Sequence, residues 1–218
     1  MASKIQLYSL ATPNGQKASI ALEEMALPYD AHKIDITKGE QHTPDYLKIN
    51  PNGKIPAIVD PNGPDGKPIS IMESGAILIY LAEKSGKFLS ANPRLRSETL
   101  QWLFFQVGGV GPMFGQFGHF FSHAKDKCND PYPVKRYTDE TRRLLTVLNQ
   151  HLEGKEFLVG NDYSIADMAT VPWVNALTQF YNAGEILNLK EFQSVNAWAK
   201  RVSERPKTAQ GMKVCGFQ

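Results

Sequence analysis

The sequence predicts a chain in two parts, an α/β domain over residues 1–87 followed by an all-helical domain over residues 93–218. Two observations predict this division. The first part alternates short β-type runs with helical runs, whereas the second part contains helical periodicity alone. Between them, near residues 85–93, the stretch KSGKFLSANPR has the glycine, serine and proline content typical of a linker. The 218 residues suffice for two small domains, each with its own core.

The composition narrows the class of protein. Hydrophobic residues make up 42% of the chain and charged residues 21%, which is typical of a globular protein. The net charge is +2, and no basic run is longer than Arg142-Arg143, so we expect no nucleic-acid partner. The apolar segment 168–177 is too short to cross a bilayer, and the N-terminal stretch lacks the long apolar core of a signal peptide. We therefore expect no membrane partner.

The cysteine content indicates the compartment. The chain has two cysteines, Cys128 and Cys215, which are far apart in the sequence and lie outside any Cys-x-x-Cys arrangement. Such usage favours free thiols in a reducing environment over a disulfide framework. We expect a cytoplasmic protein.

The first part predicts the element order β-α-β-α-β-β-α. Residues 5–10 alternate apolar and polar side chains as a strand does, and apolar residues at helical spacing follow from near Asn14. The later elements are a strand, a short helical piece, two antiparallel strands joined by a turn, and a helix that stops at Gly86: residues 29–36, 44–47, 55–59, 68–72 and 73–83.

The second part predicts long helices. One starts near Leu100 and meets the glycine-rich stretch GGVGPMFGQFGHFF, and another covers residues 132–152. Ser164-Ile165-Ala166-Asp167 resembles a capping box, and the apolar run behind it predicts a helix at the centre of a bundle. The last predicted helix has an apolar face and ends at Arg205-Pro206; the face comprises Phe192, Val195, Trp198, Ala199 and Val202.

This order of elements suggests a thioredoxin-like topology, which directs attention to the first strand–helix turn, ATPNGQK. In that layout the N–H groups of the helix N-terminus face the reacting group and stabilise a thiolate. The turn contains no cysteine, so the thiol would arrive on a ligand, and Thr12 and Asn14 would donate hydrogen bonds to its sulfur. The alternative is a plain turn in which Asn14 only caps the helix.

Two further sites accompany the turn. In Lys54-Ile55-Pro56, a cis proline would leave the backbone of Ile55 able to pair with an extended peptide; the alternative is a proline on an edge strand. In Glu73-Ser74, the serine and the helix N–H groups would bind a carboxylate while the glutamate binds an amine; the alternative is an ordinary helix start. Together the three sites suit a ligand with a central thiol and an amino-acid-like end.

Four motifs show a resemblance to a known family. They are NGKIPAIVD, ESGAILIYLAEKSGKFL, LQWLFFQVGGVGPMFGQ and YSIADMATVPWVNA. The chain resembles the cytosolic glutathione transferases over almost its whole length, and ATPNG with QVGGVGPM is similar to the nu class and the fungal Ure2-type group. The resemblance implies the glutathione transferase fold, with a thioredoxin-like N-terminal domain and an all-α C-terminal domain. It also implies a homodimer, and reduced or oxidised glutathione as co-substrate without a metal.

The resemblance also implies roles for single residues. Thr12 and Asn14 match the pair near the glutathione sulfur and are the expected catalytic residues. The expected glutathione contacts are Gln41 at the glycyl end, Lys54 and the backbone of Ile55 at the cysteinyl unit, Glu73 and Ser74 at the γ-glutamyl end, and Arg136 reaching the bound glutathione or its disulfide.

Other features are interpreted as structural. His119 and His123 have a metal-compatible spacing, but no third ligand is evident, so we expect histidines of the surface or a pocket rim. Tyr8 is expected to pack within the first strand. The aromatic cluster of the helical part is expected to belong to the core, with a hydrophobic substrate wall as the alternative; it comprises Phe114, Phe117, Phe120 and Phe121.

The expected function is glutathione-dependent thiol–disulfide exchange, in which bound glutathione reduces a small disulfide or a peroxide. Because the turn contains no cysteine, both thiols of the exchange would come from glutathione. Conjugation of glutathione to electrophiles is an alternative within the enzyme class. A regulatory or binding protein with little turnover is the alternative from another class.

Overall fold

The computed structural model describes residues 4–217 of the chain. The chain divides into two compact units. One unit combines the chain up to Leu89 with the segment from Arg205 onward, and the other spans Ser90–Glu204. The boundary between Leu89 and Ser90 falls within the range 85–93, and the segment from Arg205 onward belongs to the first unit and not to the helical one.

The first unit is built on a four-stranded sheet with the order β2-β1-β3-β4. The strands are β1 (Ile5–Ser9), β2 (Tyr29–Lys33), β3 (Ala57–Asp60) and β4 (Ile69–Met72). β1 runs parallel to β2 and antiparallel to β3, and β3 is antiparallel to β4. The predicted alternation of β1 is confirmed, since Ile5, Leu7 and Ser9 are buried.

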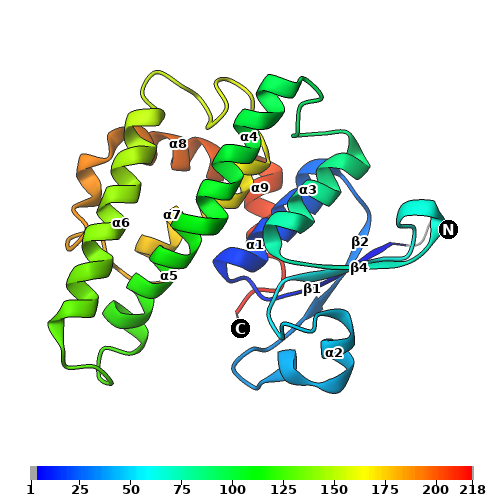
Figure 1. Ribbon diagram of the computed structural model, residues 1–218, viewed down its shortest axis with the longest axis horizontal. Helices are drawn as coiled ribbons and strands as arrows, with labels where there is room; N and C mark the ends of the chain where they lie inside the picture. The colour runs from blue at the N-terminus through cyan, green and yellow to red at the C-terminus, as the bar shows by residue number, and fades with distance from the viewer. Residues whose placement is uncertain (1–3, 218) are drawn as a thin grey trace. The chain divides into compact units, whose positions relative to one another are not determined.

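Helices cover the sheet and complete the predicted order β-α-β-α-β-β-α. α1 (Pro13–Met25) and α3 (Ser74–Ser85) contact each other on one side of the sheet, whereas α2 (Pro44–Ile49) lies on the other side (Figure 1). α3 ends at Gly86, whose φ of 68° is the left-handed conformation that glycine adopts at low cost. This unit therefore has the thioredoxin-like topology that the sequence predicts.

The C-terminal segment adds a helix that the sequence analysis missed. α9 (Pro206–Gly211) contacts α1 in Figure 1, so the helix that ends before Arg205-Pro206 is not the last one. The polar side chains of α1 explain this position. Ser19 Oγ donates to the Gly211 carbonyl at 2.8 Å, and Gln16 Nε2 donates to the Met212 carbonyl at 3.1 Å. The segment therefore satisfies polar groups that α1 would otherwise expose.

The second unit is all-helical, as predicted. Its helices are α4 (Pro93–Phe105), α5 (Gly111–Gly118), α6 (Pro131–His151), α7 (Ile165–Gln179) and α8 (Gln193–Ser203). Single π-helical turns, Gln106–Val110 and His119–His123, follow α4 and α5. Across residues 4–217, every helix is too short or too polar to cross a membrane.

α7 forms the core of this unit, as its sequence predicts. It is buried from Ile165 to Val174, and its capping box is present. The carboxylate of Asp167 accepts from the Ser164 backbone N–H at 2.9 Å and from the indole N–H of Trp198, on α8, at 2.8 Å. One buried carboxylate thus starts α7 and fixes its contact with α8.

Candidate functional site

Thr12 and Asn14 have different positions in the first strand–helix turn. Thr12 is the N-cap of α1, and its hydroxyl oxygen accepts from the Gly15 N–H at 3.3 Å. Asn14 lies inside the first turn of the helix, so the alternative in which Asn14 caps α1 is wrong. Since Thr12 Oγ1 serves here as an acceptor, its own hydroxyl proton is left to donate to another group.

The turn is fixed from two sides. A side chain on Gly15 would meet the Leu10 carbonyl oxygen at 1.8 Å, so this position admits only glycine without a backbone shift. From the other side, the Ala11 N–H donates to the carbonyl of Cys215 at 3.0 Å. The C-terminal segment therefore helps to hold the residue that precedes Thr12.

The loop before β3 presents an unpaired stretch of backbone. Tyr46 Oη and Asn50 Nδ2 both donate to the Lys54 carbonyl at 2.6 Å, which anchors the loop just before Ile55. The peptide bond between Ile55 and Pro56 is cis, as predicted. Within residues 4–217 the backbone of Ile55 makes no hydrogen bond to another backbone group. An extended peptide could therefore pair with Ile55.

Glu73 and Ser74 open α3, but not as an ordinary helix start. Glu73 has φ 69° and ψ 116°, a strained conformation for a residue that is not glycine, and its side chain caps nothing. Ser74 is buried, and its hydroxyl accepts from Nζ of Lys17 at 3.2 Å. The strain at Glu73 holds a carboxylate beside the N-terminus of α3, where local dipoles alone would bind an anion. This carboxylate suits the binding of an amine.

A pocket of about 160 Å³ joins these features within the first unit. Five of the residues that the sequence predicts line it together: Asn14, Lys54, Ile55, Glu73 and Ser74. The remaining lining residues are Asn50, Asn52 and Pro56. The pocket therefore offers amide groups, a cation, a carboxylate, a hydroxyl and a free stretch of backbone, which are complementary to a short peptide with charged ends.

Lys17 lies beneath this pocket and is almost completely buried, with 2% of its surface exposed. It projects from α1 three residues after Asn14 and reaches Ser74 at the start of α3. Burial lowers the pKa of Lys17 to about 7, although the nearby Glu73 acts to raise it. The charge of this lysine therefore changes near neutral pH.

Three predicted site residues are not among those that line the pocket. Thr12 caps α1 two residues before Asn14. Gln41 lies in the short helix Glu40–His42, and its buried Oε1 has no hydrogen-bond partner among the described residues. Arg136 belongs to α6, in the helical unit.

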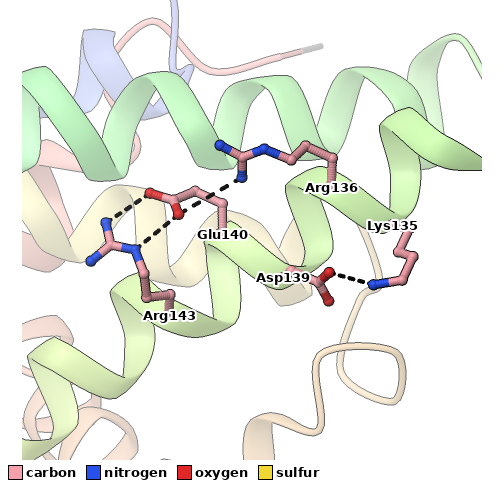
Figure 2. Close-up of polar contacts among 5 residues, drawn as sticks. All are labelled: Lys135, Arg136, Asp139, Glu140 and Arg143. Atoms are coloured by element: carbon pink, nitrogen blue, oxygen red, sulfur yellow. Dashed lines mark hydrogen bonds and ion pairs between the residues drawn. The ribbon is translucent and has the colours of Figure 1, made fainter.

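Arg136 takes part in a row of charges on α6, which Figure 2 shows. Glu140 lies between two arginines: Arg143 donates to it twice, at 2.9 and 2.8 Å, whereas Nη1 of Arg136 is 3.8 Å from Glu140 Oε2. Hydrogen bonds from Arg143 hold the pKa of Glu140 below its ordinary value. The carboxylate is thus held mainly by Arg143, and half of the Arg136 side chain stays exposed.

Sequence reasoning missed Lys17, Asn50 and Asn52. Asn50 is buried and organises the loop, because its Oδ1 accepts from the Asn52 N–H at 2.9 Å while its Nδ2 binds Lys54. The turn signal Asn-Pro-Asn-Gly at residues 50–53 could have indicated this role. For Lys17, the sequence offered one indication of burial: the lysine occupies a position of α1 that the helical spacing would assign to an apolar residue.

The remaining sequence features have the following places. Tyr8 stacks on His32 with ring centroids 4.7 Å apart, so it packs as predicted. Phe114 and Phe117 are buried core residues. His119 and His123 are exposed, and residues 4–217 contain no group of three His, Cys, Asp or Glu arranged to hold a metal ion.

A larger hollow of about 840 Å³ lies in the helical unit, and Phe121 and Asn196 are among its lining residues.

The cysteines are both free and partly exposed. Cys215 lies next to the first turn, because its backbone carbonyl accepts from the Ala11 N–H. Burial raises the pKa of the Cys215 thiol, against a smaller opposite effect of Lys33. The thiol is therefore protonated at neutral pH and is a poor nucleophile.

A thioredoxin-like unit with this pocket, next in the chain to an all-helical unit, is typical of the glutathione transferase class. Residues 11–84 match the glutathione S-transferase N-terminal domain, and residues 100–206 match the glutathione S-transferase C-terminal domain. The chain belongs to the glutathione S-transferase family, and its fold is the glutathione transferase fold.

One curated relative and two solved structures are similar to this chain over almost their whole length. The disulfide-bond oxidoreductase YfcG of Escherichia coli K12 is 50% identical over 209 residues, covering 95% of this chain and 94% of that protein. A glutathione transferase from Pseudomonas putida with one bound glutathione disulfide per subunit is 49% identical, with a TM-score of 0.94, covering 96% of this chain and 91% of its own. One from Pseudomonas fluorescens with two bound glutathiones is 48% identical, with a TM-score of 0.96 and coverages of 98% and 94%.

Proposed function

We propose that this protein is a glutathione-dependent enzyme that reduces disulfide bonds by thiol–disulfide exchange. One observation carries the proposal: Asn14, Ile55, Glu73 and Ser74 line one pocket at a thioredoxin-like turn that has no cysteine of its own. The disulfide-bond oxidoreductase name of the 50% identical relative and the glutathione disulfide bound to a 49% identical one support it.

In this proposal glutathione binds as an added strand. Its γ-glutamyl amine meets Glu73, its γ-glutamyl carboxylate meets Ser74 and the N-terminus of α3, and its cysteinyl unit pairs with the backbone of Ile55. Lys54 is a neighbouring charged contact. Gln41 contacts the glycyl end, where its Oε1, an acceptor with no partner within residues 4–217, would accept from the glycyl N–H. Arg136 reaches the glutathione or its disulfide, and its loose pairing with Glu140 supports this availability.

The reaction uses two glutathiones. The first loses its thiol proton, and the thiolate, stabilised by donors from Thr12 and Asn14, attacks one sulfur of the substrate disulfide. A mixed disulfide forms and one substrate thiolate leaves, taking up a proton. The second glutathione thiolate then attacks the glutathionyl sulfur, giving glutathione disulfide and the second substrate thiol. No oxidant or reductant other than glutathione is consumed.

Two further activities would use the same bound thiolate. Attack on a peroxide would oxidise glutathione, and attack on an electrophile would conjugate it. A regulatory protein that binds glutathione with little turnover remains the alternative from another class. The disulfide-bond oxidoreductase name of the 50% identical relative favours disulfide reduction.

The proposal extends to subgroup, assembly and location. The motifs ATPNG and QVGGVGPM support the nu-class and Ure2-type subgroup. We propose a homodimer, as the resemblance implies; the exposed Phe104 on α4 and Met72 on the edge strand β4 support a buried interface in solution. The two free cysteines support a cytoplasmic location.

A cysteine-free protein tests the mechanism. In the variant Cys128→Ser with Cys215→Ser, we expect the rate of glutathione-dependent reduction of hydroxyethyl disulfide to stay within about twofold of wild type, because the thiolates come from glutathione. Cumene hydroperoxide and chlorodinitrobenzene, assayed at the same glutathione concentration, separate the peroxidase and conjugating alternatives. A folded variant without activity would show that a protein thiol is required, and three inactive substrates with intact glutathione binding would favour the regulatory alternative.

A further inference from the structure

Lys17 is a buried cation that the proposed reaction does not yet use. Its side chain is 2% exposed, and its ammonium nitrogen lies 3.2 Å from the hydroxyl oxygen of Ser74. Burial of a lysine opposes folding unless partners compensate it. Ser74 lines the pocket, and so does Asn14, one turn before Lys17 on α1. The buried lysine, whose burial opposes folding, is therefore in direct contact with a residue of the proposed ligand site.

In the hydrogen bond between Lys17 and Ser74, the donor and the acceptor are fixed. An ammonium group can only donate, so the Ser74 oxygen accepts from Lys17. A hydroxyl that accepts such a bond keeps its own proton for donation, and a cation behind it makes that proton a stronger donor. The natural acceptor for this proton is a carboxylate in the pocket. Glu73, exposed at the pocket, is suited instead to an amine.

We propose that Lys17 is a positioning residue for the ligand carboxylate: from below the pocket it orients the Ser74 hydroxyl and supplies the charge that balances the bound anion. This inference rests on the proposed function, because it takes the carboxylate to be that of the γ-glutamyl unit of glutathione. Lys17 does not touch the ligand; it acts through Ser74.

The protonation state of Lys17 supports this role. With a pKa lowered to about 7 by burial, the lysine of the empty protein is partly neutral near pH 7.5, and a bound carboxylate would favour its charged form. Glu73 is the charged group that acts on it. Other titratable groups on the elements packed against α1 face other partners: Tyr8 stacks on His32, Tyr80 and Lys84 bind Asp60, Lys207 binds Glu23, and Arg205 binds Glu24.

A binding experiment with two ligands separates this role from a structural one. S-methylglutathione has no ionisable thiol, and its analogue with 4-aminobutyrate in place of the γ-glutamyl residue keeps the amine but lacks the carboxylate. By titration calorimetry at pH 7.5, we expect Lys17→Met to weaken binding of S-methylglutathione about tenfold or more and binding of the analogue less than twofold. Lys48→Met, which removes an exposed lysine on α2, should change neither affinity.

Proton counting gives a second measurement that needs no variant. In buffers of different ionisation enthalpy, the wild-type protein should take up on the order of half a proton with S-methylglutathione and clearly less with the analogue. Equal weakening of both ligands by Lys17→Met, or equal proton uptake with both, would overturn the role of Lys17 and leave the proposed function intact. If wild-type protein binds neither ligand, the proposed function itself fails, and the inference fails with it.

Discussion

Glu73 and Lys17 are each in a state that opposes folding. Glu73 has φ 69° without being glycine, which costs roughly 1–3 kcal/mol, and Lys17 is a buried cation. Glu73 lines the pocket just before α3, and Lys17, on α1, contacts Ser74, which also lines it. When two unfavourable local states occur together, binding explains them better than packing does, because an apolar residue at position 17 and a glycine at position 73 would fold more easily.

The role of Asn14 can be separated from that of the helix cap. Since Thr12 caps α1, Asn14→Ala leaves the cap in place, whereas Thr12→Ala removes it at a cost of about 1 kcal/mol in stability. If Asn14 donates to the glutathione thiolate, Asn14→Ala should raise the thiol pKa by about one unit and slow turnover about tenfold near neutral pH. The rate should partly recover as the pH rises.

The measurement for Asn14 is a pH–rate profile, with thiolate absorbance near 240 nm titrated in parallel. Thr12→Ser serves as the control, because it keeps the hydroxyl and should stay close to wild type. A wild-type thiol pKa in Asn14→Ala would mean that Asn14 only shapes the turn.

Asp60 makes stability depend on pH. Its side chain is buried at the end of β3, where it binds Lys84 at 2.8 Å and Tyr80 at 2.6 Å. Burial by itself would raise the carboxyl pKa, but these bonds and the Asn62 N–H outweigh it, so the pKa is lowered. The folded pKa thus lies below the unfolded value of about 3.9, and the stabilisation is complete above that value and lost as pH falls through the folded pKa.

We expect Asp60→Asn to lower the free energy of unfolding by roughly 1–3 kcal/mol at pH 7 and to flatten its decline below about pH 4. Urea denaturation between pH 3 and 7 measures both effects. Asp45→Asn removes a fully exposed carboxylate that also pairs with a lysine, and should change little. An unchanged acid slope in Asp60→Asn would show that other carboxylates govern the acid transition.

At the scale of elements, α1 depends on partners from the C-terminal segment of the chain. Its polar positions Gln16 and Ser19 would suit an exposed face, yet the backbone of α9 and the residue after it bind them. The bidentate pair of Arg205 with Glu24 fixes the entry to α9, with distances of 2.9 and 2.8 Å. The C-terminal segment therefore supports the helix that carries Thr12 and Asn14.

Gly211→Ala tests this contact. Alanine normally stabilises a helix relative to glycine by about 1 kcal/mol, but here its Cβ would lie 2.5 Å from Ile20 Cα. Because the neighbouring atom belongs to the backbone and cannot rotate away as a side chain would, we expect the steric clash to outweigh the gain in helix propensity. The free energy of unfolding should fall by roughly 1–3 kcal/mol. Gly184→Ala, with open space around it, is the matched control. Urea denaturation measures the free energy of unfolding of both variants. A Gly211→Ala protein as stable as wild type would mean that α9 is held loosely against α1.

At the scale of the whole molecule, the chain combines two units with separate cores and nearly balanced charge. The 24 basic and 22 acidic residues leave a net charge of +2. All eight residues that line the pocket come from the first unit, whereas Arg136 belongs to the helical one. The glutathione contacts that line the pocket in the proposed site therefore all belong to the first unit.

The sequence by itself determined the element order and four residues that line the pocket, Asn14, Ile55, Glu73 and Ser74, because these depend on local rules: hydrophobic period, turn residues and helix starts. Lys54 followed from the resemblance to the glutathione transferases. The sequence assigned residues 205–218 to the wrong unit, since the partners of Ser19 and Gln16 lie 192 and 196 positions away. It also missed Lys17 and Asn50, whose burial and hydrogen bonds arise from contacts between separate elements. The tertiary structure alone decided these points, because what surrounds a polar side chain is not encoded at its own position.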